Sequence, residues 1–112
     1  MIYYTEDEGH ALREAFEREV LVWPKVETRS MFGCPAYVVE GKLFAFLVSD
    51  GVVITQIRKR DRQTLAESFH TEPFTAGERE IERWRKVHLE SVERLGRVLP
   101  YVKKSYELVL SH

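Results

Sequence analysis

The sequence predicts a mixed α+β domain with an antiparallel sheet of about five strands. Apolar residues recur every three or four positions near each end of the chain, which is the period of an amphipathic helix. Between these ends, short apolar runs alternate with Gly, Pro and Asp residues, as in a meander of antiparallel strands. The chain has 112 residues, of which 44% are hydrophobic and 31% are charged. Residues 1–112 are therefore expected to form one globular domain.

The first helix is expected to begin near Thr5 and to end before Pro24. The Thr5 hydroxyl can accept a hydrogen bond from the first helical turn, and the three acidic residues that follow it favour a helix N-terminus. A residue that precedes proline is disfavoured in the helical region, so the helix stops there. The apolar stripe of this helix consists of Leu12, Phe16, Val20 and Trp23.

Four strands are expected next. The predicted strands cover Glu27–Phe32, Ala36–Val39, Leu43–Ser49 and Val52–Ile57. Residues 33–35 (Gly-Cys-Pro) are expected to break or bulge the chain, and Asp50-Gly51 is a signal for a two-residue hairpin. The run from Leu43 to Val48 is apolar at every position. It is therefore expected to be the central strand, covered on both faces or paired with a partner on one.

A second helix, between the fourth and fifth strands, is expected from the basic residues near Arg58 to about His70. A polar loop that contains Pro73 and Gly77 is expected to follow it. The fifth strand is then predicted at Trp84–Leu89, although part of this segment also fits a helical turn.

The carboxyl-terminal segment has the clearest helical pattern. Its apolar stripe consists of Val92, Leu95, Leu99, Val102, Tyr106 and Val109. Pro100 lies within this stripe, cannot donate a hydrogen bond to the Gly96 carbonyl and crowds that turn. The sequence therefore predicts a break at Pro100 and two consecutive helices.

Charge and hydropathy exclude several classes of protein. The formal net charge is −1, no apolar run is long enough to span a membrane, and acidic residues stand where a secretory signal would be basic. These features predict a cytoplasmic protein without membrane association. The charge is uneven, however, because residues 1–57 hold 5 basic and 9 acidic side chains, whereas residues 58–112 hold 12 and 9. An anion-binding surface is therefore expected in the second half.

The sequence predicts no catalytic, cofactor-binding or metal-binding residues. Phosphate-binding glycine loops, dinucleotide-binding motifs and cysteine pairs at metal spacing are all absent, and the histidines, at positions 10, 70, 88 and 112, are far apart. Cys34 with His70 or His88 is the one combination that could form a nucleophile and its base. A small apolar residue at a strand break is the favoured interpretation of Cys34.

Two basic stretches are the candidate nucleic-acid site. The candidate contact residues are Arg58, Lys59, Arg60, Arg62, Arg83, Arg85 and Lys86. Trp84 stands among them, and a ring between arginines could stack on a base while the guanidinium groups bind phosphate. DNA is therefore one expected partner, although the same pattern also fits an ordinary solvated face. The alternative function is a protein-interaction module or chaperone-like homodimer, using the Leu43–Val48 strand or an aromatic patch of Tyr3, Tyr4 and Trp23.

Two motifs carry a resemblance to known families. Residues 29–33 (Arg-Ser-Met-Phe-Gly) and residues 41–45 (Gly-Lys-Leu-Phe-Ala) resemble the amino-terminal domain of the TfoX/Sxy competence regulators. The second half, with residues 84–89 and the terminal segment 104–109, is similar to the MmcQ/YjbR group. The resemblance covers about residues 28–110 and implies an α+β fold with a curved antiparallel sheet. It also implies a regulatory or DNA-binding accessory role, and it brings no catalytic residue.

Overall fold

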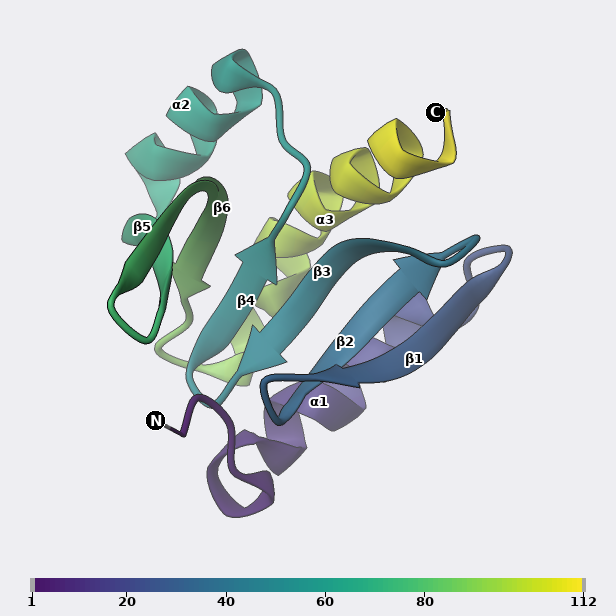
Figure 1. The fold of residues 1–112 in the computed structure, drawn as a ribbon, viewed down its shortest axis with the longest axis vertical. Coiled ribbons are helices and arrows are strands. Elements are labelled where there is room, and N and C mark those ends of the chain that lie inside the picture. The colour runs from purple at the N-terminus through teal and green to yellow at the C-terminus, as the bar shows by residue number, and fades with distance from the viewer. Residues whose placement is uncertain (1, 112) are drawn as a thin grey trace.

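The computed structural model describes residues 2–111 and confirms the α+β class (Figure 1). The helices within this range are α1 (Glu6–Val20), α2 (Lys59–Ser68) and α3 (Leu95–Leu110), with a short 3-10 helix, η1 (Val92–Arg94), before α3. The strands are β1 (Val26–Met31), β2 (Cys34–Val39), β3 (Lys42–Val48), β4 (Gly51–Ile54), β5 (Thr71–Ala76) and β6 (Arg79–His88). They form one antiparallel sheet in the order β1-β2-β3-β4-β6-β5.

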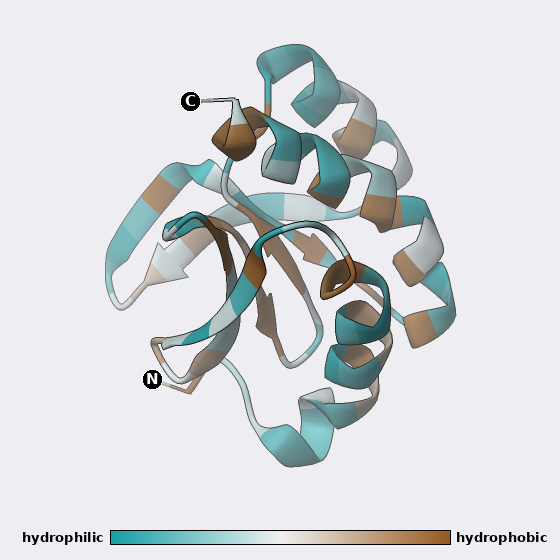
Figure 2. Ribbon diagram, turned by 90° about the vertical axis from the view of Figure 1, so that its right-hand side faces the viewer, coloured by the Kyte–Doolittle hydropathy of each residue, from teal (hydrophilic) through white to brown (hydrophobic). Residues whose placement is uncertain are grey.

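The larger hydrophobic core lies between the sheet and the helices α1 and α3, which cover the far face of the sheet in Figure 1. Phe16 of α1 lies against Tyr37 of β2 with ring centroids 4.8 Å apart, and Tyr106 of α3 lies against Phe44 of β3 at 5.5 Å. Figure 2 shows the same arrangement, with apolar residues gathered on the strands and on the helix faces turned toward them. The 3.6-residue period of α1 and α3 therefore places one apolar stripe of each helix on the sheet.

A smaller second core covers the opposite face of the sheet. Phe46 of β3 is fully buried there, with its ring edge-on to Phe74 of β5 at 5.0 Å and to Trp84 of β6 at 5.5 Å. Tyr3 and Tyr4, which precede α1, pack against the same cluster. The prediction that the third strand is central and covered on both faces is thus confirmed, because β3 is paired at both edges and lies between the two cores.

The first two strands are joined by a tight turn rather than by a bulge at residues 33–35. Phe32 and Gly33 form the turn with φ of 54° and 76°, and Met31 pairs with Cys34 across it. Positive φ at both central positions is the backbone of a type I′ hairpin turn, which Gly tolerates readily. Cys34 and Pro35 therefore already belong to β2, and the irregularity of that strand lies further on, between Tyr37 and Val38.

The predicted loop around Pro73 and Gly77 is wrong, because this segment is a hairpin. β5 pairs with β6 through a turn at Gly77, where φ is 64°, and this adds a sixth strand to the sheet. β6 is also longer than the predicted fifth strand, since it begins at Arg79. The hairpin was missed because only Phe74 is buried in β5 and the start of β6 is charged, so neither stretch shows a strong apolar pattern.

The predicted break at Pro100 is also wrong, because α3 is continuous from Leu95 to Leu110. The interruption lies before the helix, at η1. Pro100 and Gly96 are both exposed, so the carbonyl that loses its helical partner faces solvent. The buried residues on the opposite face hold both halves of α3 on one line.

Two buried hydroxyl groups fix α3 on the rest of the fold. The Ser105 hydroxyl donates to the Phe44 carbonyl at 2.7 Å and accepts from the Gln56 backbone N–H at 3.1 Å. The Tyr106 hydroxyl donates to the Pro24 carbonyl at 2.7 Å, as expected of a tyrosine that anchors a helix.

None of the helices in residues 2–111 has the length and hydropathy that a membrane crossing requires.

Candidate nucleic-acid interface

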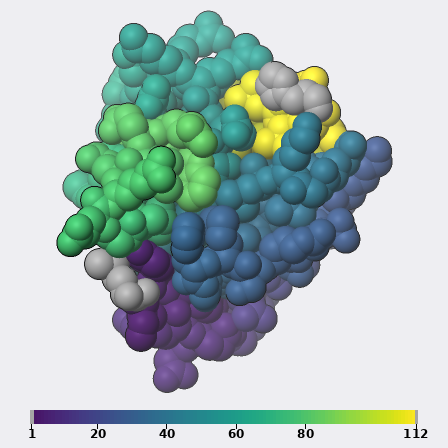
Figure 3. All heavy atoms as spheres, in the orientation of Figure 1, coloured from purple at the N-terminus to yellow at the C-terminus, as the bar shows by residue number. Residues whose placement is uncertain are grey.

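A hollow of about 760 Å³ lies between α2, the β5–β6 hairpin and the β1–β2 turn. Arginine side chains from three positions line it, namely Arg62 of α2 and both Arg79 and Arg83 of β6. Phe32, which is 50% exposed, and Trp84 contribute aromatic surface to the same walls. This arginine hollow therefore combines three cationic groups with two rings. Figure 3 shows the green β5–β6 hairpin and the teal α2 as neighbours at the surface.

A bulge of three residues in β6 forms one wall of the arginine hollow. Pro73 pairs with Arg85 but the next residue, Phe74, pairs with Ile81, so residues 82–84 have no partner in β5. The extra residues let the chain turn between these two pairs, and bulges re-aim side chains in this way. Arg83 is exposed as a result, whereas Trp84 reaches back to the second core.

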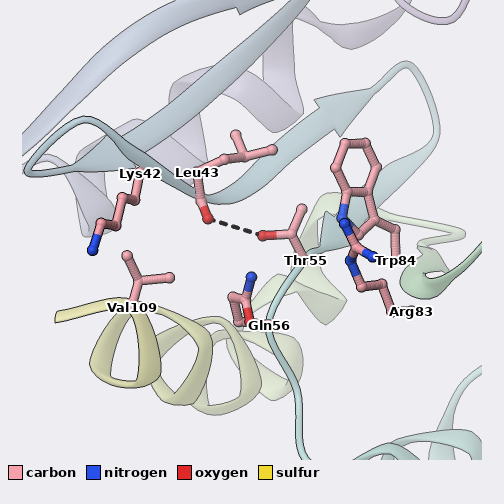
Figure 4. Close-up of a pocket in the computed structure, with 7 residues that line it drawn as sticks. All are labelled: Lys42, Leu43, Thr55, Gln56, Arg83, Trp84 and Val109. Carbon is pink, nitrogen blue, oxygen red and sulfur yellow. Dashed lines mark hydrogen bonds between the residues drawn. The ribbon is translucent and has the colours of Figure 1, made fainter. Parts of the chain in front are cut away.

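A second, smaller hollow of about 350 Å³ lies on the other side of the same bulge (Figure 4). Arg83 and Trp84 line it together with residues from the start of β3, the two residues that follow β4 and the last turn of α3. The Thr55 hydroxyl donates to the Leu43 carbonyl at 3.1 Å across this hollow. Arg83 and Trp84 therefore border both hollows, and a long ligand that lies over the bulge would meet them from either side.

Six basic side chains of α2 and the β5–β6 hairpin form no ion pair within residues 2–111. They are Arg58, Lys59, Arg60, Arg62, Arg79 and Arg83. The acidic residue within the α2 run, Asp61, instead pairs with Lys104 of α3 at 3.7 Å. The three arginines of the hollow therefore form no ion pair within residues 2–111, and Glu80 and Glu82, which also line it, leave a net charge of +1.

Two of the predicted contact residues lie elsewhere. The Arg85 side chain is 13% exposed and its Nη1 lies 3.5 Å from the Glu82 carboxylate, while its Nε is buried without a hydrogen-bond partner in the described residues. Lys86 lies 3.5 Å from Asp50 and 3.9 Å from Glu72. Both cations are therefore engaged within the protein. Arg79 and Phe32 were not among the predicted residues, because the hairpin and the turn that place them at the hollow were not predicted.

The structure separates Cys34 from the histidines that could have activated it. Cys34 is buried in the second core, and its Sγ lies 3.8 Å from the Phe32 carbonyl. His70 and His88 lie side by side at the end of the β5–β6 hairpin that is opposite to the Gly77 turn. The His88 backbone N–H donates there to the His70 carbonyl. Burial raises the pKa of the Cys34 thiol to about 11, which opposes formation of a nucleophilic thiolate.

Cys34 is expected to react with a thiol reagent such as DTNB only when the protein unfolds. A pKa about two units above the ordinary value lowers the thiolate fraction roughly 100-fold near neutral pH, and burial blocks access as well. The measurement compares the absorbance change of the native protein with that of the same chain in denaturant, where the thiol should react fully. Rapid reaction of the native protein would revive Cys34 as a nucleophile.

Comparison with known proteins gives no family assignment for this chain. No protein family, curated protein or solved structure gives a significant match. The interpretation of the interface therefore rests on its own geometry and chemistry.

Proposed function

We propose that the chain is a non-enzymatic, TfoX/YjbR-like accessory protein of the cytoplasm that binds single-stranded DNA at the arginine hollow. One observation supports this most strongly, which is the meeting at one surface of two aromatic rings and three arginines that form no ion pair within residues 2–111. Proteins that bind single strands combine these two elements, because cations follow the phosphates while rings stack on the bases.

Phosphate binding would come from the arginines. A guanidinium group can donate two parallel hydrogen bonds to a phosphate, and a group that has no internal ion pair gives up no existing partner when it does so. The exposed start of α2 holds three further cations that are close in sequence to Arg62, namely Arg58, Lys59 and Arg60. These side chains would extend the phosphate contacts along the DNA strand. The overall charge of −1 does not oppose this, since the acidic excess lies in the first half of the chain.

Base stacking would come from Phe32 and Trp84. The Phe32 ring lies on the Phe74 ring with centroids 6.2 Å apart and has an edge contact with Tyr3, so it is held in place although it is half exposed. The Trp84 ring is similarly fixed by Phe46. Rings that are already ordered lose little conformational entropy when a base stacks on them, and each stacked base contributes about 1–3 kcal/mol.

The test replaces Arg62, Arg79 and Arg83 with glutamine and measures binding of a fluorescent oligothymidylate by anisotropy. The variant is expected to bind roughly 100-fold more weakly, because three charge-assisted contacts are lost. The slope of log K against log salt should also fall by about 2, since each phosphate contact on a single strand contributes about 0.7. The matched control removes three cations from the α1 and β1 side, with Arg18, Lys25 and Arg29 replaced by glutamine.

The control triple variant carries the same change in net charge and should retain most of the affinity. Equal losses in the two triple variants would mean that only net charge matters, and would contradict a defined interface. Phe32→Ala should weaken binding about tenfold without changing the salt slope, because it removes a stacking ring but no charge. Preference for duplex over single-stranded DNA would contradict the stacking part, and no binding at low salt would end the proposal.

The alternative function, a protein-interaction or chaperone-like homodimer, has less support. Residues 44–48 of the apolar strand are buried, and both edges of β3 are paired within the sheet. The aromatic patch is also engaged, since the Tyr3 hydroxyl accepts from the Gly77 N–H at 2.7 Å and the Lys103 ammonium lies over the Trp23 ring at 4.6 Å. Sedimentation velocity distinguishes the two, because a stable dimer without affinity for DNA would favour the alternative.

A further inference from the structure

Three side chains of types that can bind metals gather near the start of β5 and the end of β6. His70 lies just before β5, Glu72 lies within β5, and His88 is the last residue of β6. Pairing of Thr71 with Val87 places His70 beside His88, although they are 18 positions apart in the sequence. This group could not be predicted from the sequence, because the segment that forms the hairpin was expected to be a loop.

The three side chains are close enough to share one ion. One ligand atom from each, a ring nitrogen of His70 and of His88 and a carboxylate oxygen of Glu72, all lie within 4.8 Å of one another. The closest pair is His88 Nε2 and Glu72 Oε1, which are 3.0 Å apart, and the two imidazole rings lie with centroids 4.8 Å apart. Bonds of about 2.0–2.2 Å to a tetrahedral ion place ligand atoms roughly 3.3 Å apart, so small side-chain rotations would complete the site.

We propose that His70, Glu72 and His88 form a binding site for a divalent transition-metal ion such as Zn²⁺. Two imidazoles and one carboxylate suit zinc, cobalt or nickel, whereas calcium and magnesium prefer an all-oxygen set. Three protein ligands leave a fourth position for water or another molecule, and the exposure of His70 and Glu72 gives access to it. This inference goes beyond the proposed DNA interface and does not depend on it.

A fourth residue orients the His88 ring for this role. Asp50 Oδ2 lies 3.3 Å from His88 Nδ1, on the side of the ring opposite to Glu72. Histidines that bind metals commonly donate their other ring N–H to a carboxylate, which fixes the tautomer and the direction of the ring. A proton on Nδ1, accepted by Asp50, leaves the lone pair of Nε2 free for the metal. The position of Asp50 is itself fixed, since its backbone carbonyl accepts from the Leu89 N–H at 2.9 Å.

The charges at the site also favour a dication. Asp50 and Glu72 contribute two negative charges and Lys86 one positive charge, because its ammonium lies within 4 Å of both carboxylates. With neutral histidines the group therefore carries a net charge of −1. A glutamate is ionised at neutral pH, as a metal ligand must be.

The experiment measures Zn²⁺ binding to the full chain without an affinity tag by titration calorimetry, and uses Co²⁺ absorption to report the coordination geometry. Binding of one ion per chain is expected. His70→Ala, Glu72→Gln and His88→Ala should each weaken it at least 100-fold, because loss of an outer-shell partner alone costs about 10–100-fold. Asp50→Asn, which removes such a partner, should fall in that smaller range. Lys86→Gln should strengthen binding, since it removes a competing cation.

The matched control is His10→Ala. His10 also lies between two carboxylates, with Nδ1 2.8 Å from Glu6 and Nε2 2.9 Å from Glu14, but it belongs to no three-residue metal-binding group among the described residues. This variant should bind zinc as the unaltered chain does. Equal losses in the His10 and His70 variants, or no binding of Zn²⁺ or Co²⁺ at all, would overturn the proposal and leave an ion-pair network around His88. His70 is exposed, so its variant keeps the test valid if His88→Ala fails to fold.

Discussion

Replacing Gly51 with alanine is expected to lower the free energy of unfolding by about 3 kcal/mol, the upper end of the usual cost of overpacking. Gly51 begins β4 and pairs with His88 of β6. A Cβ atom at this position would overlap the Val87 carbonyl oxygen and lie 3.1 Å from its carbonyl carbon. The obstacle is backbone rather than a flexible side chain, so the two strands would have to separate. Urea denaturation followed by circular dichroism measures the loss.

Gly96→Ala is the matched control for this prediction. Gly96 is exposed near the start of α3, and an added Cβ would meet no atom within 4 Å. The same chemical change should therefore raise stability by up to about 1 kcal/mol, because alanine favours the helix and restricts the unfolded chain. The two substitutions are thus expected to have opposite signs. A stabilising effect of Gly51→Ala, or effects of the same sign and size at Gly51 and Gly96, would contradict the close approach of β4 and β6.

The parts of the fold that were predicted from sequence are those with strong local signals. The first helix begins where Thr5 accepts a hydrogen bond from the Glu8 N–H, as the cap and the acidic first turn indicate. The central strand was evident because its unbroken apolar run requires cover on both faces. A hairpin between β3 and β4 was predicted from Asp50-Gly51, and its turn lies one residue earlier, at Ser49 and Asp50, because Gly51 already pairs with Val48. In each case a few neighbouring residues determine the local structure.

The features that were missed depend on contacts that leave no pattern in the local sequence. β5 is a strand because it pairs with β6 and because its Phe74 packs against Phe46 of β3. Residues 71–76 show no periodic apolar pattern that would indicate either contact. Continuity of α3 through Pro100 depends on burial of its other face against the sheet. Tertiary packing outweighed the local preference in both segments.

The candidate sites show the same division. Arg62 and Arg83 were identified from composition, but the arginine hollow required Arg79 and Phe32, which only the hairpin and the first turn bring to it. Basic composition alone could not separate Arg83, which has no ion pair in the described residues, from Lys86, which is engaged by two carboxylates. The pairing of β5 with β6 therefore decides both the proposed DNA interface and the proposed metal site.

Replacing Phe46 with alanine is expected to lower the free energy of unfolding by about 3–5 kcal/mol, which is the usual cost of removing a buried aromatic ring. Phe46 is fully buried, and its ring contacts both Phe74 and Trp84 in the second core. Since a domain of this kind is stabilised by about 5–15 kcal/mol in total, the variant should unfold at a much lower urea concentration. A cavity beneath Trp84 should also loosen the wall of the arginine hollow.

Phe32→Ala provides the contrast to this last prediction, because Phe32 is half exposed at the rim of the hollow. Its loss should cost less than about 1 kcal/mol of stability and yet weaken DNA binding, since little buried surface is removed while a stacking ring is lost. Phe46→Ala should instead lower stability first and affect binding only through the position of Trp84. Urea denaturation and anisotropy measured on both variants separate these effects. A larger loss of stability in Phe32→Ala than in Phe46→Ala would mean that the second core does not depend on Phe46, contrary to its burial against Phe74 of β5 and Trp84 of β6.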